Sequence, residues 1–404
     1  MTTPQVEEHW DVVVVGAGPA GAAAALGALT ADPALRVLLL DRSDFPRDKS
    51  CGDGIAPHVL DSLAEVGAGD VIDDWAPLRD LEMSHGHVSV SGAMRREVHV
   101  VPREVFDARL VERAVAAGAV LRRHRATSVS TPGVPVVSGE IGAEVVVGAD
   151  GAHSLVREAL LGRRRDPRAI AIRGYAPTTP EMRGRQLIRY GHRRQPSYAW
   201  AFDRGDGLAN VGYGELLPDD RSGAAPPSRA LLLEQLEELV PGAAATGSGW
   251  RGHHLPLSSW RWDQPDGRVL LVGDAAGLVN PMTGEGIYYA VATGIAAGRN
   301  AAGAIRSGRA DDAGARHRRV VRSLLGRHLR HTFVASRLAR APRLVDAGIE
   351  AAGRDRHVFD TLVELGLGGG RIDARLATGL LRSLARPSRP SPELDTDPQE
   401  VRGG

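Results

Sequence analysis

The amino-acid sequence predicts an α/β fold, in which strands buried on both faces alternate with helices. Three apolar runs carry this prediction, at 11–15 (DVVVV), 36–42 (RVLLLDR) and 268–277 (RVLLVGDAAG). A strand that is covered on both faces reads as a continuous apolar run, whereas a half-exposed strand alternates. An alanine-rich stretch with strong helix propensity follows the first run. The first 42 residues therefore read as one β-α-β unit.

Length and composition limit the classes of protein to consider. The 404 residues suffice for one large domain or two ordinary ones, and 43% hydrophobic with 25% charged residues is typical of a globular protein. A net charge of +1 gives no reason to expect a nucleic-acid partner. One cysteine excludes an internal disulfide, and neither a signal peptide nor an apolar run of ~18 residues is present. We expect a cytoplasmic protein, with peripheral membrane contact left open.

The best-defined motif is GAGPAG at 16–21, directly after the first buried strand. Gly16 allows a tight turn, Gly18 lets the backbone approach a pyrophosphate, and Gly21 permits close packing of helix on strand. The following helix N-terminus offers N–H groups to phosphate. Asp41 ends the next strand, where a carboxylate can accept hydrogen bonds from an adenosine ribose. We therefore predict a Rossmann-like dinucleotide-binding domain rather than a purely structural glycine turn.

The remaining elements follow from apolar periodicity. Residues 55–66 predict a helix capped near Asp53 or Gly54, 102–119 predict another, and 144–154 predict a buried strand with a tight turn. The stretch 170–262 is sheet-rich with one clear helix at 228–240.

These elements group into a discontinuous domain organisation. We expect the dinucleotide-binding domain to comprise 9–75, 100–165 and 266–315, a sheet-based substrate domain to comprise 76–99 and 166–265, a helical region to span 316–383, and a disordered tail to span 384–404. Arginines in the helical region alternate with Val321, Leu325, Leu329 and Phe333. That face either packs on the first domain or meets an anionic membrane, and packing is the favoured interpretation.

The stretch FPRDKSCGDG at 45–54 contains the only lysine and the only cysteine of the chain, Lys49 and Cys51. A nearby cation and a helix N-terminus would lower the pKa of the Cys51 thiol. The alternatives are a surface lysine paired with Asp48 or Asp53, and a cysteine that is only a small apolar spacer.

Two later stretches, VGADGAHS and LLVGDAAGLVNPMTGEGI, resemble the distal FAD motifs of the p-hydroxybenzoate hydroxylase-like flavoprotein superfamily. The resemblance implies FAD as the dinucleotide, with Asp274 near the pyrophosphate and ribitol. The loop 281–286 would open a long helix whose N-terminal dipole faces the flavin, unless it is an ordinary glycine-rich helix start. Together the motifs predict FAD contacts from Gly16, Gly18, Pro19, Ala20, Gly21, Asp41, Arg42, Cys51, Gly52, Arg103, Asp150, Gly273, Asp274, Pro281, Gly284, Glu285, Gly286 and Ile287.

Within this superfamily the chain resembles the geranylgeranyl reductase family. The family's K-x-C-G-[GD]-G loop is intact at 49–54, and its Y-x-W-x-F-P strand reads YAWAFD, with Asp203 in place of proline. The resemblance implies that Cys51 and Lys49 lie at the flavin and that Tyr198 and Trp200 line the substrate cavity. Period-2 spacing places Tyr198, Trp200 and Phe202 on one sheet face.

The family resemblance implies an FAD-dependent oxidoreductase that reduces C=C bonds of an isoprenoid or other apolar substrate, with Cys51 as proton donor. The main alternative is an FAD-dependent monooxygenase acting on a bulky hydrophobic metabolite, and a distant one is a non-catalytic flavin-binding protein. No second GxGxxG is present, so the electron donor would be transiently bound NAD(P)H or a reduced ferredoxin-like protein. The histidines do not predict a metal site.

Overall fold

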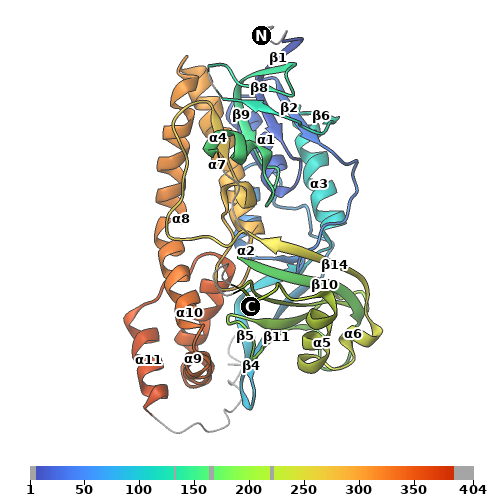
Figure 1. Cartoon of the computed structure of the whole chain (residues 1–404), viewed down its shortest axis with the longest axis vertical. Coiled ribbons are helices and arrows are strands. Elements are labelled where there is room, and N and C mark those ends of the chain that lie inside the picture. Colours follow the sequence, from blue (N-terminus) through green and yellow to red (C-terminus); the bar gives the residue numbers. More distant parts are fainter. Residues whose placement is uncertain (1–5, 132, 163–167, 219–222, 386–404) are drawn as a thin grey trace, which may run out of the picture.

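Two β-sheets form the two halves of the molecule, and the C-terminal helices run along one side of both (Figure 1). The computed structural model describes residues 6–131, 133–162, 168–218 and 223–385. Its mixed α/β architecture confirms the predicted fold class, a Rossmann-like domain with a second sheet and C-terminal helices. The exact domain boundaries stay a prediction.

The first sheet is built around the strands that the apolar runs predict. Its seven strands follow the order β6-β2-β1-β9-β8-β7, with β15 paired to β9, and the pairs among β6, β2, β1, β9 and β15 are parallel. The strands are β1 (Glu8–Val15), β2 (Val37–Asp41), β6 (Val120–Arg123), β7 (Val129–Ser130), β8 (Val136–Val137), β9 (Ile141–Gly148) and β15 (Val269–Leu271). The carboxyl ends of parallel strands share one sheet edge, so the GAGPAG loop and Asp41 meet there.

The second sheet has eight strands in the order β14-β10-β13-β12-β11-β4-β5-β3. The strands are β3 (Gly54–Ile55), β4 (Pro77–His85), β5 (Val88–Val100), β10 (Ala169–Pro177), β11 (Arg185–Tyr190), β12 (Tyr198–Asp203), β13 (Leu208–Leu216) and β14 (Ser248–Leu255). Helices α5 (Arg229–Leu239) and α6 (Ala243–Thr246) pack on β10 and β13. Apolar side chains of β4 and β5 instead form a core with the C-terminal helices.

The other helices are α1 (Pro19–Ala31), α2 (Pro57–Ala64), α3 (Arg103–Ala116), α4 (Leu155–Leu161), α7 (Ile287–Arg306), α8 (Ala313–Leu338), α9 (Pro342–Arg354), α10 (Arg356–Leu367) and α11 (Ala374–Leu384). Val321, Leu325 and Leu329 of α8 are buried in the core of the first sheet, which confirms the packing interpretation for these three residues, whereas Phe333 is half-buried and contacts Arg337. No helix in the described ranges is long and apolar enough to cross a membrane.

Two sequence predictions fail at helix ends. The helix expected from residue 55 begins at Pro57 after an Ala56 N-cap, because Gly54 and Ile55 pair with β5 instead. Asp53 and Gly54 therefore do not cap it. The expected tail begins too early, because Leu384 is still in α11. Residues 386–404 lie outside the described part of the chain.

Helices α1 and α7 touch backbone to backbone. A Cβ added at Gly294 would lie 2.3 Å from the Ala20 carbonyl oxygen, and one at Gly298 would lie 2.0 Å from that of Ala24. A Cβ on Gly27 of α1 would lie 2.5 Å from the carbonyl oxygen of Ile295. Real Cβ atoms do not approach backbone so closely, so this contact requires glycine on both helices.

We expect Gly298→Val to lower the free energy of unfolding by about 2–4 kcal/mol, because the new side chain forces α1 and α7 apart. Chemical denaturation with circular dichroism measures this effect. The matched control is Gly303→Ala in the same helix, where a Cβ meets only the Arg316 guanidinium, at 3.5 Å. Alanine there should leave stability unchanged or raise it by up to about 1 kcal/mol. Equal effects of the two variants would contradict the close-contact interpretation.

Candidate cofactor and active site

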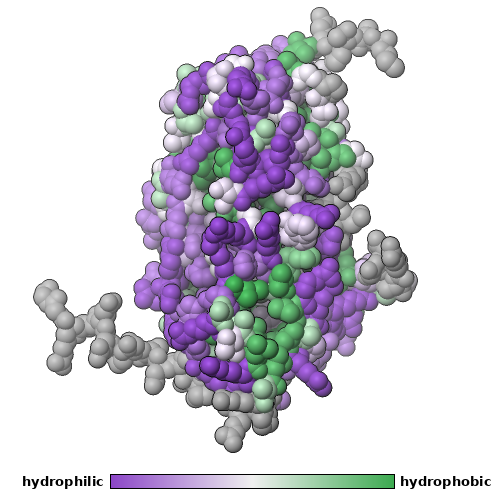
Figure 2. Space-filling model, turned by 90° about the vertical axis from the view of Figure 1, so that its left-hand side faces the viewer, coloured by the Kyte–Doolittle hydropathy of each residue, from purple (hydrophilic) through white to green (hydrophobic). Residues whose placement is uncertain are grey.

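A cavity of about 860 Å³ connects the carboxyl edge of the first sheet with the second sheet and the C-terminal helices. Of the predicted site residues, all except Gly21 and Gly273 line it. Gly21 packs instead on the loop below, where a Cβ would lie 1.8 Å from the Gly16 carbonyl oxygen. On the side of α8, Figure 2 shows a hollow surrounded by apolar residues. The placement fits the predicted roles, which themselves stay predictions.

Glycines and arginines gather at the end of the cavity that the first sheet forms. Gly16 has a φ of +100°, and a Cβ there would lie 2.4 Å from the Ala149 carbonyl oxygen. Gly18 faces two guanidinium groups, since its Cβ would lie 3.3 Å from Arg47 and 3.9 Å from Arg103. The backbone N–H groups at the start of α1 and the guanidinium groups of Arg47 and Arg103 therefore lie around the space beside Gly18.

Carboxylates hold both arginines in place. Arg103 donates two hydrogen bonds, of 2.6 and 2.7 Å, to the fully buried Asp107 one turn later in α3. Arg47 also lies 3.3 Å from Asp107 and 3.8 Å from Asp41. Neither Arg47 nor Asp107 was among the predicted site residues. The i, i+4 spacing of Arg103 and Asp107 could have indicated their pairing.

Asp41 supports the glycine loop in addition to any role at the ribose. Its carboxylate accepts hydrogen bonds from the backbone N–H of Ala17 and of Ser43, each at 2.9 Å. Asp150 has a similar double use: its carboxylate accepts from the Ser154 hydroxyl at 2.5 Å and from the N–H of Val156 at 3.2 Å, so it orders the start of α4. Arg42 lines the cavity but is exposed.

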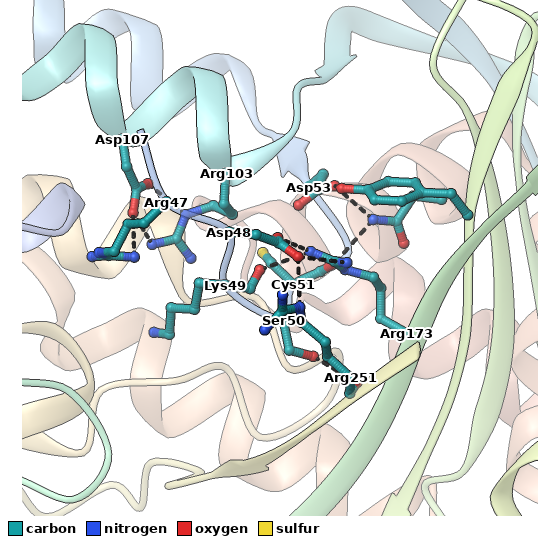
Figure 3. Close-up of polar contacts among 12 residues, drawn as sticks. Arg47, Asp48, Lys49, Ser50, Cys51, Asp53, Arg103, Asp107, Arg173 and Arg251 are labelled. Atoms are coloured by element: carbon teal, nitrogen blue, oxygen red, sulfur yellow. Dashed lines mark hydrogen bonds and ion pairs between the residues drawn. The ribbon is translucent and has the colours of Figure 1, made fainter. Parts of the chain in front are cut away.

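The loop with Lys49 and Cys51 is held by the buried Arg173 of β10 (Figure 3). The Arg173 guanidinium pairs with Asp48 and donates to the backbone oxygens of Lys49, at 3.0 Å, and Cys51, at 3.3 Å. Arg251 of β14 adds a second contact to Asp48, at 2.8 Å. The second sheet therefore fixes a loop that begins at the first sheet.

Asp53 anchors the same loop from its other end. It is fully buried with a φ of +59°, and its carboxylate accepts from the Tyr175 hydroxyl at 2.6 Å and the Asn210 amide at 2.8 Å. Asn210 also donates to the Cys51 carbonyl and accepts from the Trp200 indole. Burial raises the pKa of Asp53 to about 6, although hydrogen bonds from Tyr175 and Asn210 oppose the rise.

The structure corrects two predictions about the loop. Lys49 pairs with neither Asp48 nor Asp53, since its Nζ lies 3.4 Å from Asp274, across the cavity end. The pKa of the Cys51 thiol is raised by burial rather than lowered: Arg103 is the cation that opposes the rise, and α2 begins only at Pro57. The thiol is therefore protonated at neutral pH.

Glu285 changes the expected environment at the start of α7. Its carboxylate accepts the backbone N–H of Tyr288 at 2.8 Å, so an acidic side chain shares the helix N-terminus that is predicted to face the flavin. Burial raises the pKa of Glu285 to about 7, against the lowering effect of these backbone hydrogen bonds.

One wall of the cavity is aromatic. Tyr198, Trp200 and Phe202 of β12 all line it, as the period-2 spacing predicts, and the ring centroids of Tyr198 and Trp200 are 6.0 Å apart. The Tyr198 hydroxyl donates to the Thr283 carbonyl, which connects this wall to the loop before α7. Asp203 accepts from the Gly184 N–H at 2.7 Å, so it orders the neighbouring turn outside the cavity.

Comparison with known proteins gives the family. The model of the FAD binding domain family matches residues 9–323. A digeranylgeranylglycerophospholipid reductase of Methanopyrus kandleri is 33% identical over 354 residues, 81% of this chain and 89% of the relative. A geranylgeranyl diphosphate reductase of Rhodobacter capsulatus is 31% identical over 75% of this chain and 78% of the relative, and a menaquinone reductase of Mycobacterium tuberculosis is 32% identical over 72% and 76%.

The chain belongs to the geranylgeranyl reductase family of FAD-dependent oxidoreductases.

Solved structures of this fold include a geranylgeranyl bacteriochlorophyll reductase-like protein from Thermoplasma acidophilum. Its TM-score is 0.72 at 21% identity, and the match covers 94% of this chain and 96% of that protein. A probable FAD-dependent monooxygenase from Pseudomonas aeruginosa has a TM-score of 0.62 at 20% identity, with coverages of 87% and 100%. At these identities the likeness shows the fold alone, which a reductase and a monooxygenase share.

The cofactor of this family fits the described residues. The absence of a side chain at Gly18 leaves space between the loop and the guanidinium groups of Arg47 and Arg103, which would supply positive charge to a pyrophosphate. Asp41, the predicted ribose contact, and the loop 281–287 line the same cavity. FAD is therefore the cofactor of this reductase-family chain.

We expect Glu285→Gln to change how stability depends on pH. The unfolded carboxyl has its usual pKa near 4.5 and the folded one about 7, so the wild type loses stability as pH rises between these values. Glutamine keeps the acceptor for Tyr288 but cannot ionise. The variant should gain up to about 3 kcal/mol over wild type at pH 8, less whatever water in the cavity screens, and little at pH 4.5. Parallel stability curves from denaturation across this pH range would contradict the burial of this carboxyl.

Proposed function

We propose that this family member uses FAD to reduce C=C bonds in the isoprenoid chain of an apolar substrate. The observation that carries the proposal is the extent of the cavity: it runs from the phosphate loop past Cys51 to apolar side chains of the C-terminal helices. A long apolar chain fits such a space, and a small polar molecule would leave its far end unfilled. Two relatives named for geranylgeranyl compounds support the same substrate class.

Bound FAD would supply the hydride for this reduction. Gly18, Arg47 and Arg103 would hold its pyrophosphate, Asp41 its ribose, and the loop 281–287 its flavin end. Lys49, paired with Asp274, would lie over the junction between these parts. The aromatic wall of Tyr198 and Trp200 would hold the substrate chain against the flavin and exclude water.

Cys51 is the proposed proton donor. Reduction of an alkene needs a proton at the carbon opposite the hydride, within a cavity that apolar groups keep dry. The raised pKa keeps a proton on the Cys51 sulfur at neutral pH. Arg173 and Asn210 fix the position of this residue through its carbonyl oxygen.

The monooxygenase alternative keeps one sequence observation in its favour, the Asp203 that replaces the family's proline. The location of Asp203 outside the cavity weakens this argument. For the electron donor we retain transiently bound NAD(P)H or a reduced ferredoxin-like protein. Anaerobic bleaching of the flavin by NADPH or NADH, compared with reduced ferredoxin, distinguishes them.

Chemically reduced enzyme should saturate a prenyl substrate without oxygen, because only a hydride and a proton are needed. Mass spectrometry of an anaerobic single turnover should show a product with two hydrogen atoms added. A product that forms only after air is admitted and contains one added oxygen atom would support the monooxygenase alternative. Absence of any turnover with all reductants would favour a non-catalytic flavin-binding protein.

Cys51→Ala should retain FAD and stability but slow the oxidation of reduced flavin by substrate about 10²–10⁴-fold, the usual contribution of a positioned acid. Cys51→Ser should recover little, because a hydroxyl is a far weaker acid than a thiol. Single-turnover flavin absorbance measures the rate. Equal rates for wild type and Cys51→Ala would show that the thiol is only a spacer.

A further inference from the structure

The apolar end of the cavity opens between three C-terminal helices. Ala335 and Leu338 of α8, Leu344 of α9, and Leu376 and Leu380 of α11 line it there. Leu338 is also 38% exposed, so the lining reaches the surface. We call this opening the helical mouth. It is lined from α11, at one end of the molecule, whereas the phosphate loop before α1 lies toward the other end (Figure 1).

Large apolar side chains project from the helices of this mouth into solvent. Leu381 and Leu384, three residues apart on α11, are 67% and 45% exposed, and Val334 on α8 is 47% exposed. Figure 2 shows an apolar patch around a hollow on this side of the molecule, bordered by hydrophilic residues. Contiguous apolar surface around a cavity opening indicates a contact with another apolar phase or molecule.

The border of the mouth is strongly cationic. Residues 330–345, at the mouth end of α8 and the start of α9, contain four arginines and no aspartate or glutamate, and α11 adds Arg382. Within the described ranges, Arg337, Arg340, Arg343 and Arg382 form no ion pair with a carboxylate. Burial lowers the pKa of Arg340, and the nearby positive charges of Arg337 and Arg168 lower it further, so like charges lie close together here.

We propose that the helical mouth docks on an anionic phospholipid bilayer, with Leu381 and Leu384 inserted at the interface and the arginines against lipid phosphates. The apolar side chains match the acyl region of such a bilayer, and the surrounding arginines match its layer of phosphate headgroups. An acidic protein partner would satisfy the arginines but leave the exposed leucines without an apolar phase. The surface thus fits a membrane better than a polar partner.

The docking also explains why the mouth is where it is, and this step rests on the proposed function. Moving an isoprenoid chain from a bilayer into water is unfavourable, and the cost grows with each CH₂ group that becomes exposed. An opening held at the bilayer lets the chain pass into the cavity without crossing water. The polar cofactor end then remains on the side away from the lipid.

Sedimentation with vesicles tests the docking without any substrate. The FAD-loaded wild type should bind vesicles of phosphatidylglycerol and phosphatidylcholine, bind phosphatidylcholine alone at least 10-fold more weakly, and lose affinity at high salt. Leu381→Glu with Leu384→Glu should reduce binding at least 10-fold, and Arg340→Glu with Arg382→Glu should do so on anionic vesicles.

Two matched controls keep the test specific. Leu121→Glu introduces the same change at a 38% exposed leucine of β6, at the opposite end of the molecule (Figure 1). Arg319→Glu reverses an exposed charge on α8 about 28 Å along the helix from Leu338. Both controls should bind vesicles like the wild type, and thermal melting and flavin content should match in all variants.

Three results would overturn the docking: no binding of the wild type to anionic vesicles, equal losses in the controls, or a dimer in light scattering that Leu381→Glu dissociates. The last result would assign the patch to a second copy of the chain. Turnover separates this inference from the proposed function. The mouth variants should reduce detergent-dispersed substrate normally and vesicle-embedded substrate slowly, whereas failure of every variant and the wild type on both substrates would reject the function alone.

Discussion

The backbone contact between α1 and α7 determines the geometry of the cofactor end. Helix α1 begins directly after the glycine-rich loop, and α7 begins directly after the loop 281–286. Because Gly294 and Gly298 allow the helices to touch, both N-termini reach the same cavity. A side chain in this contact would separate the two loops that have to hold opposite ends of one dinucleotide. Glycine here therefore serves the site through packing rather than through chain flexibility.

A second constraint joins the two sheets. Arg173 and Asn210 belong to the second sheet, yet both hold backbone oxygens of the loop that contains Cys51. That loop also provides Arg47, which reaches the phosphate end. The position of the proposed proton donor thus depends on both halves of the molecule at once. Any relative movement of the sheets would shift Cys51 with respect to the flavin or to the aromatic wall.

Features that depend on short spacings could be predicted from the sequence, whereas contacts between residues far apart in the chain could not. The phosphate loop, the end of β2 and the aromatic stripe of β12 depend on spacings within a few residues, which periodicity reveals. Lys49 and Asp274 are 225 residues apart, and Arg173 and Asp48 are 125 apart. No local pattern identifies such partners. The pKa of Cys51 was predicted with the wrong sign for the same reason: a neighbouring lysine is visible in the sequence, but burial by distant segments is not.

Burial around Cys51 has two opposing effects on the proposed reaction, one on the substrate and one on the acidity of the thiol. A dry cavity favours a long apolar substrate and leaves the positioned acid as the proton source, but it also disfavours charge and so raises the pKa of the acid. A weaker acid gives up its proton more reluctantly, yet it is fully protonated when substrate arrives. Arg103 lies close enough to lower the thiol pKa without reversing the effect of burial. The same guanidinium faces the phosphate loop, so one buried cation, held by Asp107, influences both the cofactor end and the proton donor.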